Sequence, residues 1–216
     1  MNPLTPPANN RYQHASGLLL GFHGCDRATG EAVLSGNVRH LSPSTNDYDW
    51  LGGGIYFWEN DPQRALEFAQ EASKHPKKSA GKIRDPFVVG AVIDLRLCLN
   101  FLERPALDEL QLAYQFFKQT FRPNAKHKKF PANAGEDRGA RFLDAAVIDM
   151  LHKMRAALNT QTHAFPAYDS VRGAFWEGGA LYPGAGFEQK SHIQIAVRNP
   201  EACIKGYFRP LVESTA

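Results

Sequence analysis

The hydrophobic positions of the chain predict strands near both ends and helices in the middle. Residues 17–25 form a nearly continuous apolar run, which is typical of a buried strand, and this run ends at the His23–Gly24 step. The segment 29–38 suits a short helix. After a loop rich in Ser, Pro, Asn and Asp, three glycines lead into a short strand over 54–58.

Three segments show helical spacing. Asn60-Asp61-Pro62 is a helix start signal, and the apolar residues that follow it recur every three to four positions. Similar spacing is found over 106–121 and 141–158. Between the first and second of these helices, 86–102 is a long apolar and β-branched run that predicts one or two core strands.

The last third of the chain combines apolar runs with glycine and predicts four further strands. They are expected within 168–175, 177–189, 191–197 and 203–208. Because strands and helices occur in groups, the pattern favours an α+β fold over an alternating βαβ fold. We expect a flexible N-terminal arm over 1–15 and a single domain over 16–216.

The composition is that of an ordinary folded domain. Of the 216 residues, 43% are hydrophobic and 22% are charged, which supplies a core and argues against disorder. The formal net charge of +3 neither indicates nor excludes a nucleic-acid partner. Basic clusters at 74–78 and 126–129 are solvated loops or, if they share a face, a guide for a nucleic-acid acceptor.

The three cysteines, Cys25, Cys98 and Cys203, are far apart and odd in number. Their spacing matches neither a disulfide framework nor a metal site, so we expect small buried residues in a reducing compartment and no bound metal. The apolar run at 18–20 is too short for a signal sequence or a membrane span. We therefore expect a cytoplasmic protein with no membrane partner.

Two short motifs are the candidates for chemistry. His23 lies in an apolar run and is followed by Gly24, and three glycines at 52–54 precede Tyr56. Glycine lets a backbone approach a ligand closely, and an aromatic ring supplies a flat face for stacking. Taken singly, His23 fits the more common case of a hydrogen-bonded core histidine, and Tyr56 that of a core strand residue. Together they favour a pocket for a planar ring attached to a sugar.

The blocks GFHG, LGGGIYFWENDPQRALEFA and SHIQIAVRNP resemble, in this order, the ADP-ribosyltransferase superfamily in its diphtheria-toxin and poly(ADP-ribose)-polymerase-like branch. The middle block is the most specific of the three. That branch carries a His-Tyr-Glu pattern on three strands of a split, mixed or antiparallel β-sheet that binds NAD. The resemblance implies this α+β fold with helical insertions, the main one being 74–160.

The resemblance also implies a set of NAD contacts. His23 would bond the adenosine-side ribose, the Gly24 backbone would hold the nicotinamide amide, and Tyr56 would stack on the nicotinamide ring. Gly54 belongs to the same NAD-binding block. Ser44, in the loop before the glycines, is a weaker candidate for a ribose or phosphate contact, since a serine in such a loop is more often an exposed turn residue.

Gln194 stands where the resemblance implies a catalytic glutamate. A glutamate would stabilise the positive charge that builds on the ribose as nicotinamide leaves, whereas a glutamine keeps the hydrogen bond and loses the countercharge. Superfamily members without the glutamate are similar to mono-transferases or to inactive binding modules. His192, two residues earlier, is a further candidate because it would share the same strand face.

The segment 169–179, which precedes this strand, offers a substitute charge. Glu177 would act as a general base on an acceptor or stabilise the oxocarbenium ion, and Arg172 would pair with the NAD pyrophosphate. The alternative is a glycine-rich hairpin with a solvated Glu177 and a structural Asp169–Arg172 pair.

The resemblance thus implies an NAD-dependent mono-ADP-ribosyltransferase with NAD as substrate and a protein or nucleic acid as acceptor. Such an activity suits a toxin, phage-defence or regulatory enzyme, and a toxin would add a cognate inhibitor protein as partner. The enzyme alternatives are a tRNA 2′-phosphotransferase and an NAD glycohydrolase. The alternative outside the enzymes is a non-catalytic module that binds NAD or ADP-ribose.

Overall fold

The computed structural model describes residues 17–75, 82–123, 128–135 and 140–211. These residues form a mixed seven-stranded sheet in the order β4-β5-β6-β2-β1-β3-β7, with helices packed on both faces. The α+β prediction is therefore confirmed. The predicted arm over 1–15 and parts of both basic clusters lie outside the described residues, whereas Lys74, Lys128 and Lys129 are described and exposed.

Each strand and helix is short to medium in length. In chain order they are β1 (Leu19–Asp26), α1 (Arg27–Leu34), β2 (Ile55–Glu59), α2 (Pro62–Lys74), β3 (Pro86–Ile93), β4 (Cys98–Asn100), α3 (Arg104–Thr120), α4 (Phe142–Thr162), β5 (Ser170–Phe175), β6 (His192–Val197), α5 (Pro200–Cys203) and β7 (Ile204–Phe208). The segment 74–160, predicted as an insertion, supplies β3 and β4 to the sheet.

The helix starts follow from local capping. The Asp26 side chain accepts a hydrogen bond from the Ala28 amide, so α1 begins two residues before the predicted start of 29. At α2, Asp61 accepts from the Arg64 amide, and Pro62 occupies the first turn. The expected helix start at residues 60–62 is confirmed.

The predicted strand over 177–189 is wrong. The segment between β5 and β6, residues 176–191, is a loop with one isolated bridge between Ala180 and Glu188. Gly178, Gly179 and Gly184 all have positive φ, a conformation that interrupts a strand. The other three predicted strands of the last third are present as β5, β6 and β7.

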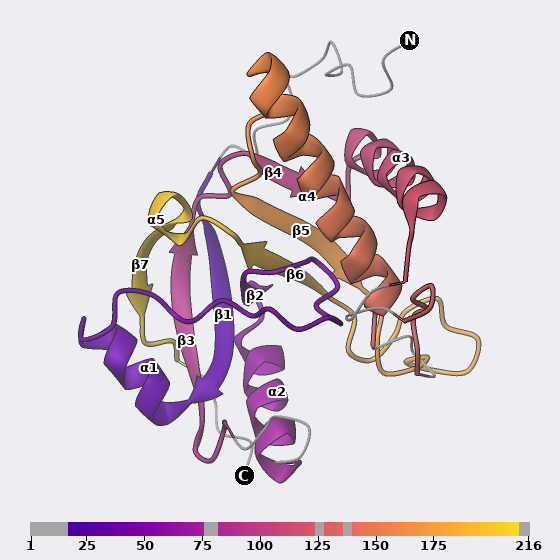
Figure 1. Ribbon diagram of the computed structural model, residues 1–216. Helices are drawn as coiled ribbons and strands as arrows, with labels where there is room; N and C mark the ends of the chain where they lie inside the picture. The colour runs from indigo at the N-terminus through magenta and orange to yellow at the C-terminus, as the bar shows by residue number, and fades with distance from the viewer. Residues whose placement is uncertain (1–16, 76–81, 124–127, 136–139, 212–216) are drawn as a thin grey trace.

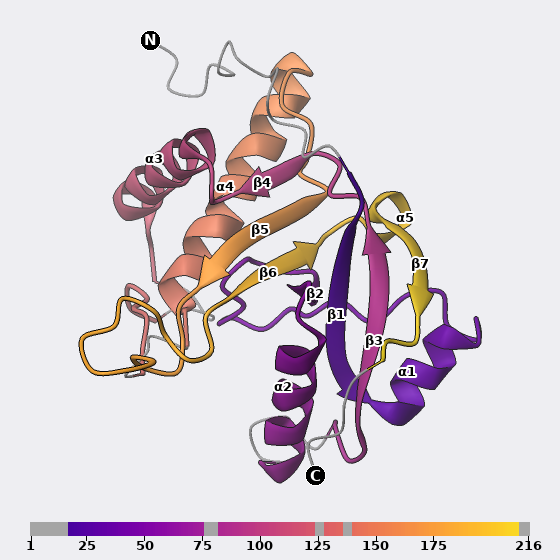
Figure 2. The same ribbon diagram turned by 180° about the vertical axis from the view of Figure 1, so that it is seen from behind.

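The strands fall into two groups, which run at a steep angle to each other in Figures 1 and 2. One group is β1, β3 and β7, and the other is β4, β5, β6 and β2. β1 pairs with β3 along eight residues, whereas β1 pairs with β2 only at Gly21–Glu59 and Phe22–Trp58. The two groups are therefore joined by a short contact at the centre of the sheet.

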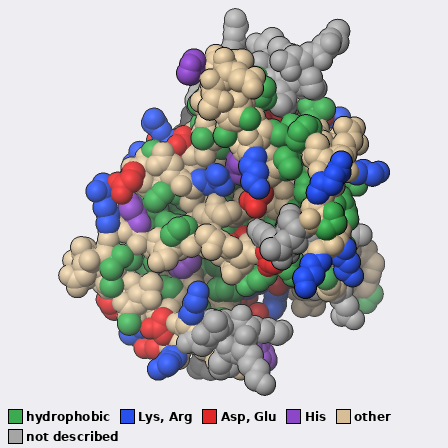
Figure 3. All heavy atoms as spheres, viewed as in Figure 1, with side chains coloured by type: hydrophobic (Ala, Val, Ile, Leu, Met, Phe, Trp, Pro, Cys, Tyr) green, Lys and Arg blue, Asp and Glu red, His purple; other side chains and the backbone are tan. Residues whose placement is uncertain are grey.

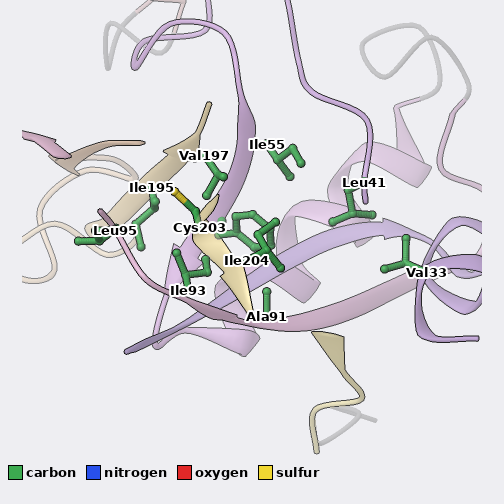
Figure 4. Packing of buried hydrophobic residues seen from close by; sticks show 11 residues of the cluster. Val33, Leu41, Ile55, Ala91, Ile93, Leu95, Ile195, Val197, Cys203 and Ile204 are labelled. Carbon is green, nitrogen blue, oxygen red and sulfur yellow. The ribbon is translucent and has the colours of Figure 1, made fainter. Parts of the chain in front are cut away.

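The sheet has two differently covered faces. Side chains of β2, β3 and β6 on the first face form a cluster with Val33 of α1, and Figure 4 shows Leu41, Cys203 and Ile204 packed into it. We call this the α1 face. On the other face, α2 packs on β1 and β3, and α3 and α4 cover Val171 of β5 and Ala196 of β6. We call this the α2 face.

The charged residues are spread over the surface. Figure 3 shows Lys, Arg, Asp and Glu side chains interspersed on one side of the molecule, without a single block of one sign. No helix in the described part of the chain is both long enough and apolar enough to cross a membrane.

Burial raises the pKa of the Cys25 and Cys203 thiols to about 12 and that of Cys98 to about 11.

Candidate functional site

His23 lies where β1 and β2 separate. Beyond the Phe22–Trp58 pair, its Nδ1 donates a hydrogen bond of 2.7 Å to the carbonyl oxygen of Tyr56. Because a carbonyl only accepts, Nδ1 carries the proton, and burial lowers the pKa of His23, which favours the neutral ring. The imidazole packs edge-on against Phe57, a residue of the α1 face. His23 thus bridges the two strand groups.

Tyr56 points to the opposite face and is held at its hydroxyl. The hydroxyl accepts from the Leu51 amide at 3.0 Å and donates to the Gly52 carbonyl at 2.8 Å. Its ring packs against the cluster formed with α3 and α4. Burial raises the pKa of Tyr56 well above its ordinary value, so the phenol stays protonated. In this structure Tyr56 supports the turn that precedes the glycines.

The three glycines meet other parts of the same chain. Gly54 exchanges backbone hydrogen bonds with Ser44, and a Cβ at Gly54 would lie 2.8 Å from the Val197 carbonyl. Gly52 has φ +76° and its amide donates to the Asp49 carbonyl, while the Gly53 carbonyl accepts from Arg198. The close approach that glycine permits is therefore made here to neighbouring backbone.

Gln194 lies on the α2 face, opposite Trp58 of β2 and Gly173 of β5. Its Oε1 accepts a hydrogen bond of 2.6 Å from Trp50 Nε1. A Cβ at Gly173 would lie 2.8 Å from the Trp50 ring, so this glycine makes the room that the indole needs. The tryptophan orients the Gln194 amide with its oxygen turned toward the indole.

A row of rings continues from Trp50 across the α2 face. The centroid distances between neighbours are 5.0, 5.5, 6.0 and 5.0 Å, and the members in order are Trp50, Phe175, His192, Trp58 and Phe68. Guanidinium groups flank the row: Arg141 lies 4.2 Å from the Phe175 centroid and Arg64 lies 5.8 Å from that of Trp58. His192 is therefore a member of this row, and Gln194 is hydrogen-bonded to its first ring.

Glu177 pairs with Arg64 of α2. The Arg64 side chain is only 7% exposed, and its Nη2 lies 2.9 Å from Glu177 Oε2. A second ion pair, between Lys190 and Glu71, joins the other end of the 176–191 loop to α2. The residue predicted as a general base therefore holds its loop to α2 in this structure.

His192 faces the same pair. Its Nδ1 donates to the Lys190 carbonyl at 2.6 Å, which leaves Nε2 as an acceptor. Burial is the largest cause of its lowered pKa, and Arg64 lowers the pKa further, whereas the bond to the Lys190 carbonyl, Glu177 and Asp61 oppose the shift. A neutral imidazole, whose Nε2 has no hydrogen-bond partner among the described residues, thus lies within electrostatic reach of an arginine–carboxylate pair.

Arg172 lies on the α1 face, away from Gln194. It forms a bidentate ion pair with Glu59, with Nε–Oε2 at 2.6 Å and Nη2–Oε1 at 2.8 Å. Asp169, the alternative partner considered from the sequence, accepts from Asn199 and from the Leu97 amide. The predicted site residues therefore divide: Tyr56, Gln194 and His192 share the α2 face, while His23 and Arg172 lie on the α1 face.

Comparisons with known proteins give no assignment. No family model, curated protein or solved structure matches this chain. The resemblance described above therefore rests on the quoted residues alone. Among the described residues, no group of three His, Cys, Asp or Glu side chains is placed to hold a metal ion.

Four residues of the site were not predicted from the sequence: Trp50, Trp58, Arg64 and Phe175. Arg64 precedes Phe68 by four residues, which places both on one side of α2, and this spacing was a readable signal. No local pattern marked Trp50, because its contact with Gln194 spans 144 positions. A hollow of about 370 Å³ between α1 and the 38–42 segment is lined by none of the predicted site residues.

Proposed function

We propose that this protein is an NAD-dependent mono-ADP-ribosyltransferase that cleaves NAD between nicotinamide and ribose. The observation that carries the proposal is the hydrogen bond from His23 to the Tyr56 carbonyl, because it joins the first two motifs of the resemblance where β1 and β2 separate. The short β1–β2 contact is in keeping with a split sheet. Gln194 follows on the next strand, in register with Trp58.

In this proposal NAD lies across the separated strands with its nicotinamide on the α2 face, near Tyr56 and the row of rings. Nε2 of the neutral His23 would accept a hydrogen bond from a hydroxyl of the adenosine-side ribose. Gln194, oriented by Trp50, would hold a ribose hydroxyl with its amide nitrogen while positive charge builds on the ribose. A nucleophile on a protein or nucleic acid would then capture the ribose carbon.

The experiment is an assay for nicotinamide release from NAD, with and without lysate, protein and nucleic-acid acceptors. The Tyr56→Phe variant keeps the ring and removes the hydroxyl bonds to Leu51 and Gly52, whereas Tyr56→Ala removes the ring as well. We expect Tyr56→Ala to abolish release and Tyr56→Phe to retain part of it. Absence of release with every acceptor class would refute the transferase.

A non-catalytic NAD- or ADP-ribose-binding module is the second candidate. Two observations favour it: position 194 carries no charge, and the nearby Glu177 carboxylate is paired with Arg64. Calorimetry that detects NAD binding without turnover would select the module. Free ADP-ribose as the product would select a glycohydrolase, and loss of a 2′-phosphate from tRNA would select a phosphotransferase.

A further inference from the structure

Four buried polar atoms around Trp58 have no hydrogen-bond partner within the described part of the chain. They are Trp58 Nε1, Arg64 Nε and Nη1, and His192 Nε2. Trp58 is 4% exposed and Arg64 is 6% exposed, so bulk water does not satisfy them. Buried polar groups in native proteins are generally paired, and unpaired ones in one place call for an ordered water or a ligand.

These atoms belong to one cluster built from three elements. The guanidinium carbon of Arg64, in α2, lies 5.8 Å from the ring centroid of Trp58, in β2. The ring centroid of His192, in the adjacent strand β6, lies 6.0 Å from that of Trp58. The pKa of His192 responds to both Arg64 and Glu177, which places all of them within electrostatic reach. Three nitrogens with N–H groups and one imidazole acceptor nitrogen, all without a partner among the described residues, thus belong to side chains that neighbour Trp58.

The charges around the cluster disfavour an anion. Arg64 is the cation of this cluster, and its Nη2 is already bound to Glu177. Asp61, whose side chain accepts from the Arg64 amide, adds a second carboxylate. A phosphate or carboxylate that accepted from Nε or Nη1 of Arg64 would thus lie beside the Glu177 carboxylate and be repelled by it.

We propose that this cluster binds an uncharged primary carboxamide. The two lone pairs of the amide oxygen would accept from Trp58 Nε1 and one Arg64 nitrogen. The two amide hydrogens would be donated to His192 Nε2 and the Glu177 carboxylate. This assignment uses each partner in the only role that its chemistry allows. The neighbouring rings of Trp58, Phe68 and His192 supply flat walls for a planar group.

Access to the cluster is controlled by the base of the 176–191 loop. Glu177 and Lys190 lie near its two ends and pair with Arg64 and Glu71 of α2, and the Lys190 amide donates to the Glu177 carbonyl. Gly178 and Gly179, both at positive φ, follow Glu177 directly. A ligand enters when the Glu177–Arg64 contact opens, and its amide replaces part of that contact.

The carboxamide has two sources, and one of them rests on the proposed function. Nicotinamide, the leaving group of NAD, is an aromatic carboxamide. An asparagine or glutamine side chain of an acceptor protein carries the same group on an aliphatic stem. The shared chemistry is the amide itself, and the experiment separates the sources by comparing aromatic with aliphatic amides.

The test uses the full chain and follows the indole N–H signals of its three tryptophans by NMR. Nicotinamide, benzamide and propionamide are the amide probes, and nicotinate, pyridine and inorganic phosphate are the controls. We expect nicotinamide or propionamide to shift the Trp58 signal strongly, with nicotinate at least about tenfold weaker in affinity. The signals of Trp50, bonded to Gln194, and of Trp176, which is 55% exposed, should shift less than that of Trp58, because neither N–H bonds the amide.

Two variants address the donors separately. Trp58→Phe keeps a ring and removes Nε1–H, and Arg64→Lys keeps the charge opposite Glu177 while removing the guanidinium nitrogens. We expect either change to weaken amide binding roughly tenfold, measured by calorimetry, as loss of one directed hydrogen bond implies. The control Trp176→Phe changes the same residue type at an exposed position and should leave affinity unchanged. Thermal unfolding checks that each variant is folded.

The outcomes are distinct for this site and for the transferase. Amide binding that is lost in Trp58→Phe supports the site whether or not NAD is cleaved. Equal or tighter binding of nicotinate or phosphate, absence of amide binding in the folded protein, or full binding by both variants would overturn it. If NAD is cleaved while amides do not bind, the site fails and the transferase stands.

Discussion

Gln194 takes a catalytic position in the resemblance but brings a hydrogen bond without a charge. Its Oε1 accepts from Trp50, and its strand neighbours on the same face are His192 and Ala196. A carboxylate at this position would still accept the indole N–H. The residue therefore allows a test in which geometry is kept and only charge is changed.

Gln194→Glu should increase nicotinamide release if NAD is cleaved here. The added negative charge would stabilise the oxocarbenium-like state, and about 1.4 kcal/mol of such stabilisation is a tenfold rate increase. The measurement is the initial rate of nicotinamide release by both proteins at equal NAD concentration. The exposed Gln189→Glu makes the same charge change in the 176–191 loop and should leave the rate unaltered. An unchanged rate in Gln194→Glu would argue against catalysis at this strand.

The Arg172–Glu59 ion pair is a second feature whose contribution to stability can be tested by single substitutions. The two side chains are 16% and 8% exposed, so breaking the pair leaves a largely buried charge. Arg172→Met should destabilise the protein by about 3 kcal/mol, and adding Glu59→Met should restore most of the loss. Urea unfolding of the two single variants and the double variant measures this.

The exposed Arg104–Asp108 pair provides the reference for this cycle. Its side chains are 84% and 59% exposed, so Arg104→Met should cost about 0–1 kcal/mol. A loss of similar size at both positions would mean that burial does not set the value of the Arg172–Glu59 pair.

At the scale of elements, the packing of α2 on β1 depends on Gly24. A Cβ at this position would lie 2.2 Å from the Ala65 carbonyl oxygen, which is backbone and cannot rotate away. The same helix presents Arg64 to Glu177 and Ala65 to the cluster around Trp58. The glycine after His23 thus sets the distance between α2 and the candidate site.

Gly24→Ala should force α2 away from the sheet. We expect a loss of about 3 kcal/mol, at the upper end for overpacked positions, together with altered signals from Trp58. The matched control is Gly206→Ala in β7, where an added Cβ meets nothing within 4 Å. Chemical unfolding compares the two variants, and equal stabilities would show that α2 adjusts without cost.

At the scale of the whole molecule, the two strand groups share only a short β1–β2 contact, to which His23 adds its bond to Tyr56. Burial lowers the pKa of His23, His152 and His192, so all three favour the neutral ring in the folded state. The pKa of His152 falls to about 3, first through burial and then through Arg198 and Arg155. Protonation of these histidines at low pH would therefore destabilise several parts of the folded protein.

Stability should fall as the pH drops below the ordinary histidine pKa of 6.5. The unfolded chain then binds protons that the folded protein rejects, and for His152 this continues down to its folded pKa of about 3. Between pH 7 and pH 5 we expect a loss of about 2 kcal/mol from this residue. Urea unfolding at both pH values measures the loss, and His152→Gln should reduce the difference. Equal pH dependence in wild type and variant would contradict this account.

The local elements could be predicted from the sequence, because apolar spacing and capping residues act over a few positions. The helix after Asp61 and the strands containing His23, Tyr56 and Gln194 were all predicted, whereas 177–189 was misassigned because glycine-rich apolar segments suit both strand and loop. The order of the strands was not predictable in this way.

Which side chains are in contact depends on the three-dimensional fold. Trp50 reaches Gln194 across 144 positions, and Arg172 and Arg64 each reach a carboxylate 113 positions away. Strand pairing and the alternation of side chains placed Tyr56 and Gln194 on one face and His23 on the other. These contacts depend on the register between strands that are distant in the sequence, which no local spacing encodes. The motifs could therefore be recognised in the sequence, but the side chains around them could not.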